Sequence, residues 1–108
     1  MNAYQSYQNI KKEGLTLKNT FLTGLTLRDC RMLSLILKDC YLQQSFIKDT
    51  DLSGADLSGS DFSDARLINV DLKGANLTDT CFHGAELINV NLKGAILDNA
   101  LLETAYFN

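Results

Sequence analysis

The side chains in this sequence that could do chemistry are few and widely separated. Cys81 and His83 stand two residues apart, a spacing that suits two metal ligands or a thiol nucleophile beside a base. Two ligands do not complete a metal site, and His83 is the only histidine. The neighbouring five-residue units supply no third ligand. The sequence therefore predicts no metal, no cofactor and no catalytic residue.

Charged side chains are unevenly distributed along the chain. Residues 1–48 hold seven Lys or Arg and three Asp or Glu, a net charge of +4. Residues 49–108 hold three and ten, a net charge of −7. Partners of opposite charge would thus meet different ends of the molecule.

An uninterrupted five-residue repeat indicates which side chains point inward and which point outward. Every fifth residue from Leu17 to Phe107 is large and apolar. An α-helix would scatter such residues around its axis, because five residues turn it by about 500°. A straight strand would alternate them between its two faces. They share one core only if the chain turns a corner within each unit. The predicted core stack includes Leu52, Leu57, Phe62, Leu67, Leu72, Leu77, Phe82, Leu87 and Leu92.

The corners are predicted two residues after each central apolar residue. Between Asn19 and Thr104, fifteen of these eighteen positions are Gly, Asn or Asp. Those residue types tolerate positive φ and form tight turns.

A second repeat sets the number of corners in each coil. Residues 65–77 recur at residues 85–97, with ten of thirteen positions identical. The offset of twenty residues equals four units, so residues twenty apart should stack and pair as parallel strands. With right-handed winding, as parallel connections prefer, the sequence predicts a right-handed quadrilateral parallel β-helix of just under five coils over residues 15–108.

Units such as Ala55-Asp56-Leu57-Ser58-Gly59 resemble the Ala-(Asp/Asn)-Leu-x-x signature of the pentapeptide-repeat family. The match is strict from Thr50 and looser from residue 15, where leucines replace the usual alanine. The resemblance implies the same right-handed β-helix. Some members of that family mimic duplex DNA, bind DNA gyrase or topoisomerase IV and confer quinolone resistance, so the resemblance offers that activity as an alternative function.

Residues 1–14 break the repeat, because Lys12 stands where an inward apolar side chain belongs. Ala3, Tyr4, Tyr7 and Ile10 lie at spacings compatible with one helical face. We therefore expect an N-terminal cap over residues 1–14, either a short helix or an irregular plug, followed by the β-helix of residues 15–108.

The two remaining cysteines fit a reducing compartment. Cys30 and Cys40 occupy inward positions half a coil apart, so they should be buried thiols on opposite sides of the stack rather than a disulfide. The sequence contains no membrane-spanning apolar run, and residues 1–10 lack the core of a signal peptide. We expect a cytoplasmic protein without membrane contact.

The last units turn apolar side chains outward and leave the final coil uncovered. An uncapped β-helix exposes strand edges and apolar core, which favours association. We expect a homodimer through the C-terminal end; the alternative is that residues beyond this chain supply a cap. The candidate interface comprises Ile96, Leu97, Leu101, Leu102, Tyr106 and Phe107.

These features favour a non-catalytic protein-binding or scaffolding module that self-associates through its C-terminal coils. An enzyme is disfavoured, because catalysis needs groups that converge in a concavity. Nucleic-acid binding is disfavoured, because the cations of the early coils fall on different sides. The alternative, a DNA-mimicking binder of gyrase, needs dense negative charge, and Lys73 and Lys93 dilute the charge of the later coils.

Overall fold

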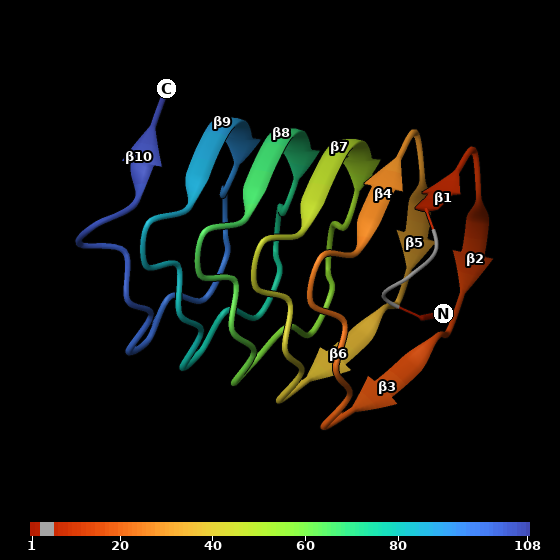
Figure 1. Ribbon diagram of the computed structural model, residues 1–108, viewed down its shortest axis with the longest axis horizontal. Helices are drawn as coiled ribbons and strands as arrows, with labels where there is room; N and C mark the ends of the chain where they lie inside the picture. The colour runs from red at the N-terminus through yellow and green to blue at the C-terminus, as the bar shows by residue number, and fades with distance from the viewer. Residues whose placement is uncertain (3–5) are drawn as a thin grey trace.

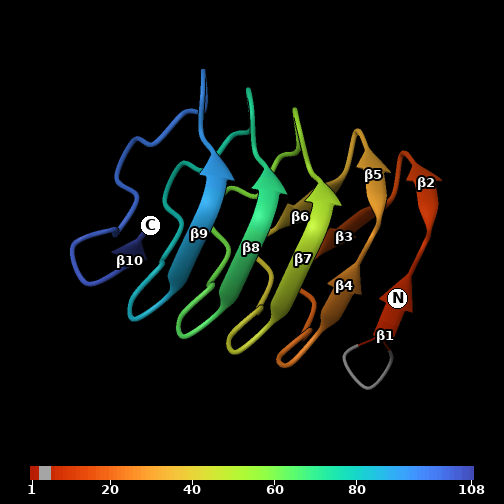
Figure 2. The same cartoon turned by 90° about the horizontal axis from the view of Figure 1, so that it is seen from above.

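A computed structural model describes residues 1–2 and 6–108 as a four-sided parallel β-helix (Figure 1). Figure 2 shows the same coils from above, with equivalent strands side by side along the stack. The strands are β1 (Ser6–Gln8), β2 (Lys11–Glu13), β3 (Thr16–Lys18), β4 (Thr26–Arg28), β5 (Arg31–Leu33), β6 (Ile36–Lys38), β7 (Phe46–Asp51), β8 (Arg66–Asp71), β9 (Glu86–Asn91) and β10 (Tyr106–Phe107).

Parallel pairing between residues twenty apart holds the coils together. One side runs β1-β4-β7-β8-β9-β10, a second pairs β2 with β5 and β5 with β7, and a third pairs β3 with β6. Phe46 pairs with Arg66, for example, and Arg66 with Glu86. Single bridges of the same offset, such as Tyr41 with Asp61, continue the stack elsewhere. The predicted all-β solenoid of about five coils is confirmed.

The corners lie where the sequence places them. Every fifth residue from Asn9 to Asn99 has a positive φ, and twelve of these residues are not glycine. Asn and Asp adopt this conformation more readily than other side chains. Gly59 has a positive φ and also little space around its Cα atom, because an added Cβ atom would collide with Oδ1 of Asp39.

The interior is a column of large apolar side chains on each of the four sides. Of the predicted core stack, the residues from Leu52 to Leu87 are buried, and Leu92 in the last coil is only partly buried. The rings of Phe62 and Phe82 stack with centroids 5.2 Å apart.

Two kinds of corner differ in the acceptor to which a backbone amide donates its hydrogen bond. Some close on themselves, as where the amide of Ser60 donates to the carbonyl of Leu57. Others rely on a side chain from the following coil. The amide of Cys30 donates to Oγ1 of Thr50 at 3.4 Å, and the amide of Cys40 donates to Oγ of Ser60 at 3.0 Å. Buried hydroxyls at inward positions are thus part of the backbone hydrogen-bond network.

The N-terminal segment departs from the prediction of a cap over residues 1–14. Residues 6–14 form no helix: β1 pairs with β4, and β2 pairs with β5, in the twenty-residue register of later coils. The β-helix therefore includes Ser6, whereas Ala3 and Tyr4 lie outside the described residues. The prediction of a cap was based on Lys12, a charged residue at a position that later coils bury. In the first coil the side chain of Lys12 reaches solvent, so a cation is tolerated there.

Candidate protein-interaction surfaces

The C-terminal end of the stack presents an open strand edge. In an inner coil the amides of Leu72 and Gly74 each donate to a carbonyl of the next coil at 2.9 Å. The equivalent amides of the last coil are those of Leu92 and Gly94. They face the end of the described stack, where these 108 residues form no further coil. This edge can accept an added strand.

Apolar side chains surround that open edge. Leu97, Leu102 and Phe107 continue the core columns, but no coil covers them, and Leu102 is only partly buried. Ile96, Leu101 and Tyr106 point outward from three successive sides. The exposed fractions are 47% for Ile96, 37% for Leu97, 61% for Leu101, 57% for Tyr106 and 49% for Phe107. The structure thus gathers the predicted interface residues at one end.

The N-terminal end has a different character. Its edge strand β2 carries Lys11, Lys12 and Glu13, and all three are exposed. Charged residues on an open edge, lysine above all, discourage pairing with another strand. Met1 also packs against the core at this end. The two ends therefore differ in character: the N-terminal edge strand is charged, whereas apolar side chains are exposed in the last coil.

A shallow polar groove of about 370 Å³ follows the corner shared by β7, β8 and β9. One wall is a ladder of side chains: Asn89 donates from Nδ2 to Oδ1 of Asn69 at 2.9 Å, and Asn69 donates to Oδ1 of Asp49 at 2.7 Å. The other wall holds Asp51 and Asp71. Periodic side-chain hydrogen bonds of this kind tie neighbouring coils together.

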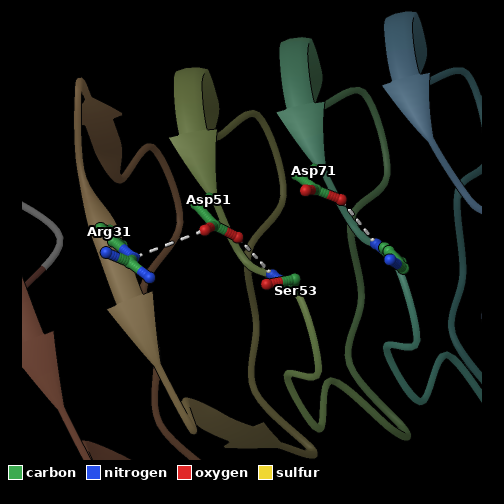
Figure 3. A network of polar contacts seen from close by, with 5 residues as sticks. Arg31, Asp51, Ser53 and Asp71 are labelled. Carbon is green, nitrogen blue, oxygen red and sulfur yellow. Dashed lines mark hydrogen bonds and ion pairs between the residues drawn. The ribbon is translucent and has the colours of Figure 1, made fainter.

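The carboxylates beside this groove are used by the fold itself. Oδ1 of Asp51 accepts the amide of Ser53 at 2.9 Å, and Oδ2 lies 3.6 Å from Nε of Arg31 (Figure 3). Partial burial raises the pKa of Asp51, but the hydrogen bonds from Ser53 and the charge of Arg31 outweigh it, so the pKa lies below its ordinary value. Asp71 accepts the amide of Lys73 in the same way. Both carboxylates therefore stabilise turns of the β-helix.

A second side shows the same arrangement. The hydroxyl and amide of Ser58 both donate to Oδ1 of Asp56, at 2.6 and 3.0 Å. The Ser58 hydroxyl is the main cause of a lowered Asp56 pKa, and the charges of Lys38 and Lys18 contribute further. Within residues 1–2 and 6–108, no three His, Cys, Asp or Glu side chains are placed to hold a metal ion.

The structure does not bring Cys81 and His83 into one site. Sγ of Cys81 lies 3.4 Å from Oγ of Ser63 in the preceding coil. Nδ1 of His83 lies 2.8 Å from Oγ1 of Thr104 in the following coil. Each side chain is engaged with a different neighbour.

Cys30 and Cys40 are buried free thiols, and Cys81 is free and partly buried. Sγ of Cys40 donates to the carbonyls of Leu17 and Lys38, at 3.4 and 3.5 Å. Burial raises the pKa of Cys40. The thiol is therefore protonated and serves as a weak donor inside the stack.

Sequence reasoning missed one exposed feature. Phe21 and Tyr41 stack on the outer surface with centroids 4.6 Å apart, although 73% of Phe21 and 41% of Tyr41 are exposed. Their twenty-residue spacing at an outward position was the available signal. Nε of Arg66 lies 2.9 Å from Oε2 of Glu86 in the following coil, and the Arg66 guanidinium also lies 5.4 Å from the centroid of the Phe46 ring.

Within residues 1–2 and 6–108, no helix is long and apolar enough to cross a membrane. This finding concerns helices alone.

Comparison with known proteins agrees with the geometry. The family model for pentapeptide repeats matches eight copies over residues 36–74, 47–84 and 85–108. A pentapeptide repeat protein, Rfr23 from the cyanobacterium Cyanothece 51142, is 19% identical, with 95% of this chain and 91% of that chain covered and a TM-score of 0.53. QnrB1, a plasmid-mediated fluoroquinolone resistance protein, is 15% identical, with 94% and 71% covered and a TM-score of 0.56.

At these identities the two structures show a shared fold. A comparison with curated proteins found no match. The family model covers more than half of the chain, and its repeats coincide with the coils described above. The chain belongs to the pentapeptide-repeat family.

Proposed function

We propose that this protein is a non-catalytic protein-binding or scaffolding module of the cytoplasm that self-associates through its C-terminal coils. The observation that carries the proposal is the uncovered last coil, where an open strand edge coincides with five exposed apolar side chains, Ile96, Leu97, Leu101, Tyr106 and Phe107. Contiguous exposed apolar surface of this kind marks protein-interaction sites. Among the described residues, the other exposed large apolar side chains are Phe21 and Tyr41, which stack on each other.

A second copy related by a two-fold axis would cover both C-terminal ends at once. Closed symmetry satisfies each open edge and prevents growth into fibres. The cross-section of the coil is small: the whole molecule measures 31 × 24 × 24 Å. The interface should therefore lie near the lower limit of about 1,000 Å² for a stable complex and dissociate on dilution.

Light scattering over a concentration series tests this dimer. We expect the wild type to shift from a monomeric to a dimeric mass, and a variant with Leu101→Asp and Tyr106→Asp to stay monomeric, because burying two carboxylates without partners is costly. Phe21→Asp is the control, since Phe21 is also a large apolar residue and is even more exposed, at 73%, but lies in the first coil. It should leave the dimer intact. A wild type that is monomeric at every concentration would contradict the proposal.

A DNA-mimicking gyrase binder is the second candidate. It is favoured by Asp49, Asp51 and Asp71, which line one corner, and by the fold shared with QnrB1. Mimicry needs a carboxylate for nearly every phosphate of the duplex it replaces. Of the six Asp and Asn side chains that line the groove, three are uncharged amides, those of Asn69, Asn89 and Asn91, which weakens the resemblance to a duplex.

A gyrase supercoiling assay separates the two candidates. We expect no inhibition, and no protection from a quinolone, at tens of micromolar protein. The matched variant is Asp51→Asn with Asp71→Asn, which removes carboxylates while keeping the turns. Inhibition by the wild type that disappears in this variant would establish mimicry in place of the binding module.

A further inference from the structure

A second surface lies at the opposite end of the molecule from the proposed dimer interface. A cavity of about 290 Å³ opens at the first coil. Its lining side chains are predominantly apolar, and one of them, Lys12, is cationic. The lining residues are Met1, Tyr7, Ile10, Lys12, Leu15 and Met32.

Lys12 occupies a position that the repeat reserves for an apolar side chain. It pairs in register with Met32, and the equivalent residues two and three coils later are Leu52 and Leu72, both buried. Among the interactions of the described residues, no ion pair involves Lys12. Lys12 thus lines the cavity, is exposed to solvent and forms no ion pair among the described residues, so its ammonium is available to an anion that enters the cavity.

We propose that this cavity binds a small amphipathic carboxylate of the medium-chain fatty acid class. The acyl chain would contact Ile10, Leu15 and Met32, and the carboxylate would lie at the ammonium of Lys12. Apolar walls favour the hydrocarbon through removal of its surface from water, and the cationic side chain of Lys12 selects an anionic head group. This inference goes beyond the proposed function, because it concerns neither the C-terminal end nor self-association.

The size of the cavity limits the length of the chain. At about 290 Å³ it has room for an acyl chain of several carbon atoms rather than for a single water molecule. Octanoate carries such a chain and one carboxylate, and it is the probe to use. Pairing with a polypeptide strand is disfavoured here, because the adjoining edge strand β2 carries three exposed charged side chains.

The chain provides a selective spectroscopic probe of this cavity. It contains two methionines, Met1 and Met32, and both line the cavity. In the untagged protein labelled with ¹³C at the methionine methyl groups, octanoate should shift both signals saturably below about 5 mM. Acetate, which has the charge without the chain, should shift neither. Absence of a saturable shift with octanoate overturns the proposal.

Two matched variants locate the head group. Lys12→Gln should weaken octanoate binding about five-fold, the usual size of a partly exposed ion pair, while leaving octanol binding unchanged. Lys11→Gln removes a neighbouring charge on the same strand and should leave octanoate binding unaffected. Equal weakening by both variants would overturn the placement at Lys12. Ile10→Phe should fill the cavity and reduce binding of both ligands, and retained binding by a folded Ile10→Phe protein also contradicts the site.

Discussion

Replacing Leu72 by alanine should lower the free energy of unfolding by about 2–5 kcal/mol. Leu72 is fully buried between two coils: its amide donates to the carbonyl of Asn91 in the following coil, and the preceding coil is joined where the amide of Leu52 donates to the carbonyl of Asp71. Covalent turns and interstrand hydrogen bonds hold these coils in place, so the structure can collapse only partly into the space that the side chain leaves. The measurement is a denaturant melt monitored by circular dichroism.

Lys73→Ala is the control for Leu72→Ala. Lys73 is adjacent in sequence but exposed, and only its backbone amide contacts Asp71. Alanine keeps that amide, so the change should alter stability by less than about 0.5 kcal/mol. Similar losses for the two variants would show that the inward assignment of Leu72 is wrong.

A second pair of substitutions should change stability in opposite directions. Oγ of Ser60 accepts the amide of Cys40 and donates to the carbonyl of Leu37. Ser60→Ala leaves the buried amide of Cys40 without that acceptor, and the Leu37 carbonyl loses a donor, so it should destabilise the protein by about 1–3 kcal/mol.

Ser45 is as buried as Ser60, but its Oγ has no hydrogen-bond partner among the described residues. Alanine already stands at the equivalent positions 65 and 85, where it is fully buried. Ser45→Ala should therefore stabilise the protein by up to about 1 kcal/mol, because it removes an unpaired hydroxyl. The same denaturant melts compare both serine variants. Destabilisation of equal size in both would mean that the hydroxyls act through packing rather than through the backbone.

The sequence was sufficient to predict the inward and outward positions and the corners. Each depends on a residue type repeated at fixed spacing: Leu, Met, Ile or Phe at the centre, and Gly, Asn or Asp at the turn. Because every coil repeats the same physical requirement, an occasional exception such as Gln44, which also adopts positive φ, does not obscure the pattern.

Features that depend on one coil or on contacts between side chains could not be predicted. Lys12 broke the apolar pattern, yet its coil forms because the first coil has a free outer surface. The ladder from Asp49 to Asn89 depends on rotamers, and spacing does not specify them. The corners before Cys40 and Ser60 differ in the acceptor of the backbone amide: Oγ of Ser60 accepts the amide of Cys40, whereas the carbonyl of Leu57 accepts the amide of Ser60. The residue spacing does not distinguish these two acceptors. For the candidate interface, the sequence indicated that the residues are apolar, but the exposed fraction of each side chain could be obtained only from the structure.

The twenty-residue pairing also determines how such a molecule can change length. Five inserted residues would keep every later leucine inward, but they would rotate all later coils by a quarter turn. Pairs such as Arg66 with Glu86 would then no longer be vertical neighbours if the insertion fell between them. Twenty inserted residues would preserve both the interior and the surface. The near-identity of residues 65–77 and 85–97 is what duplication of one whole coil leaves behind. Insertion of complete coils therefore keeps the vertical neighbours on the outer faces, whereas insertion of part of a coil places different residues beside one another there.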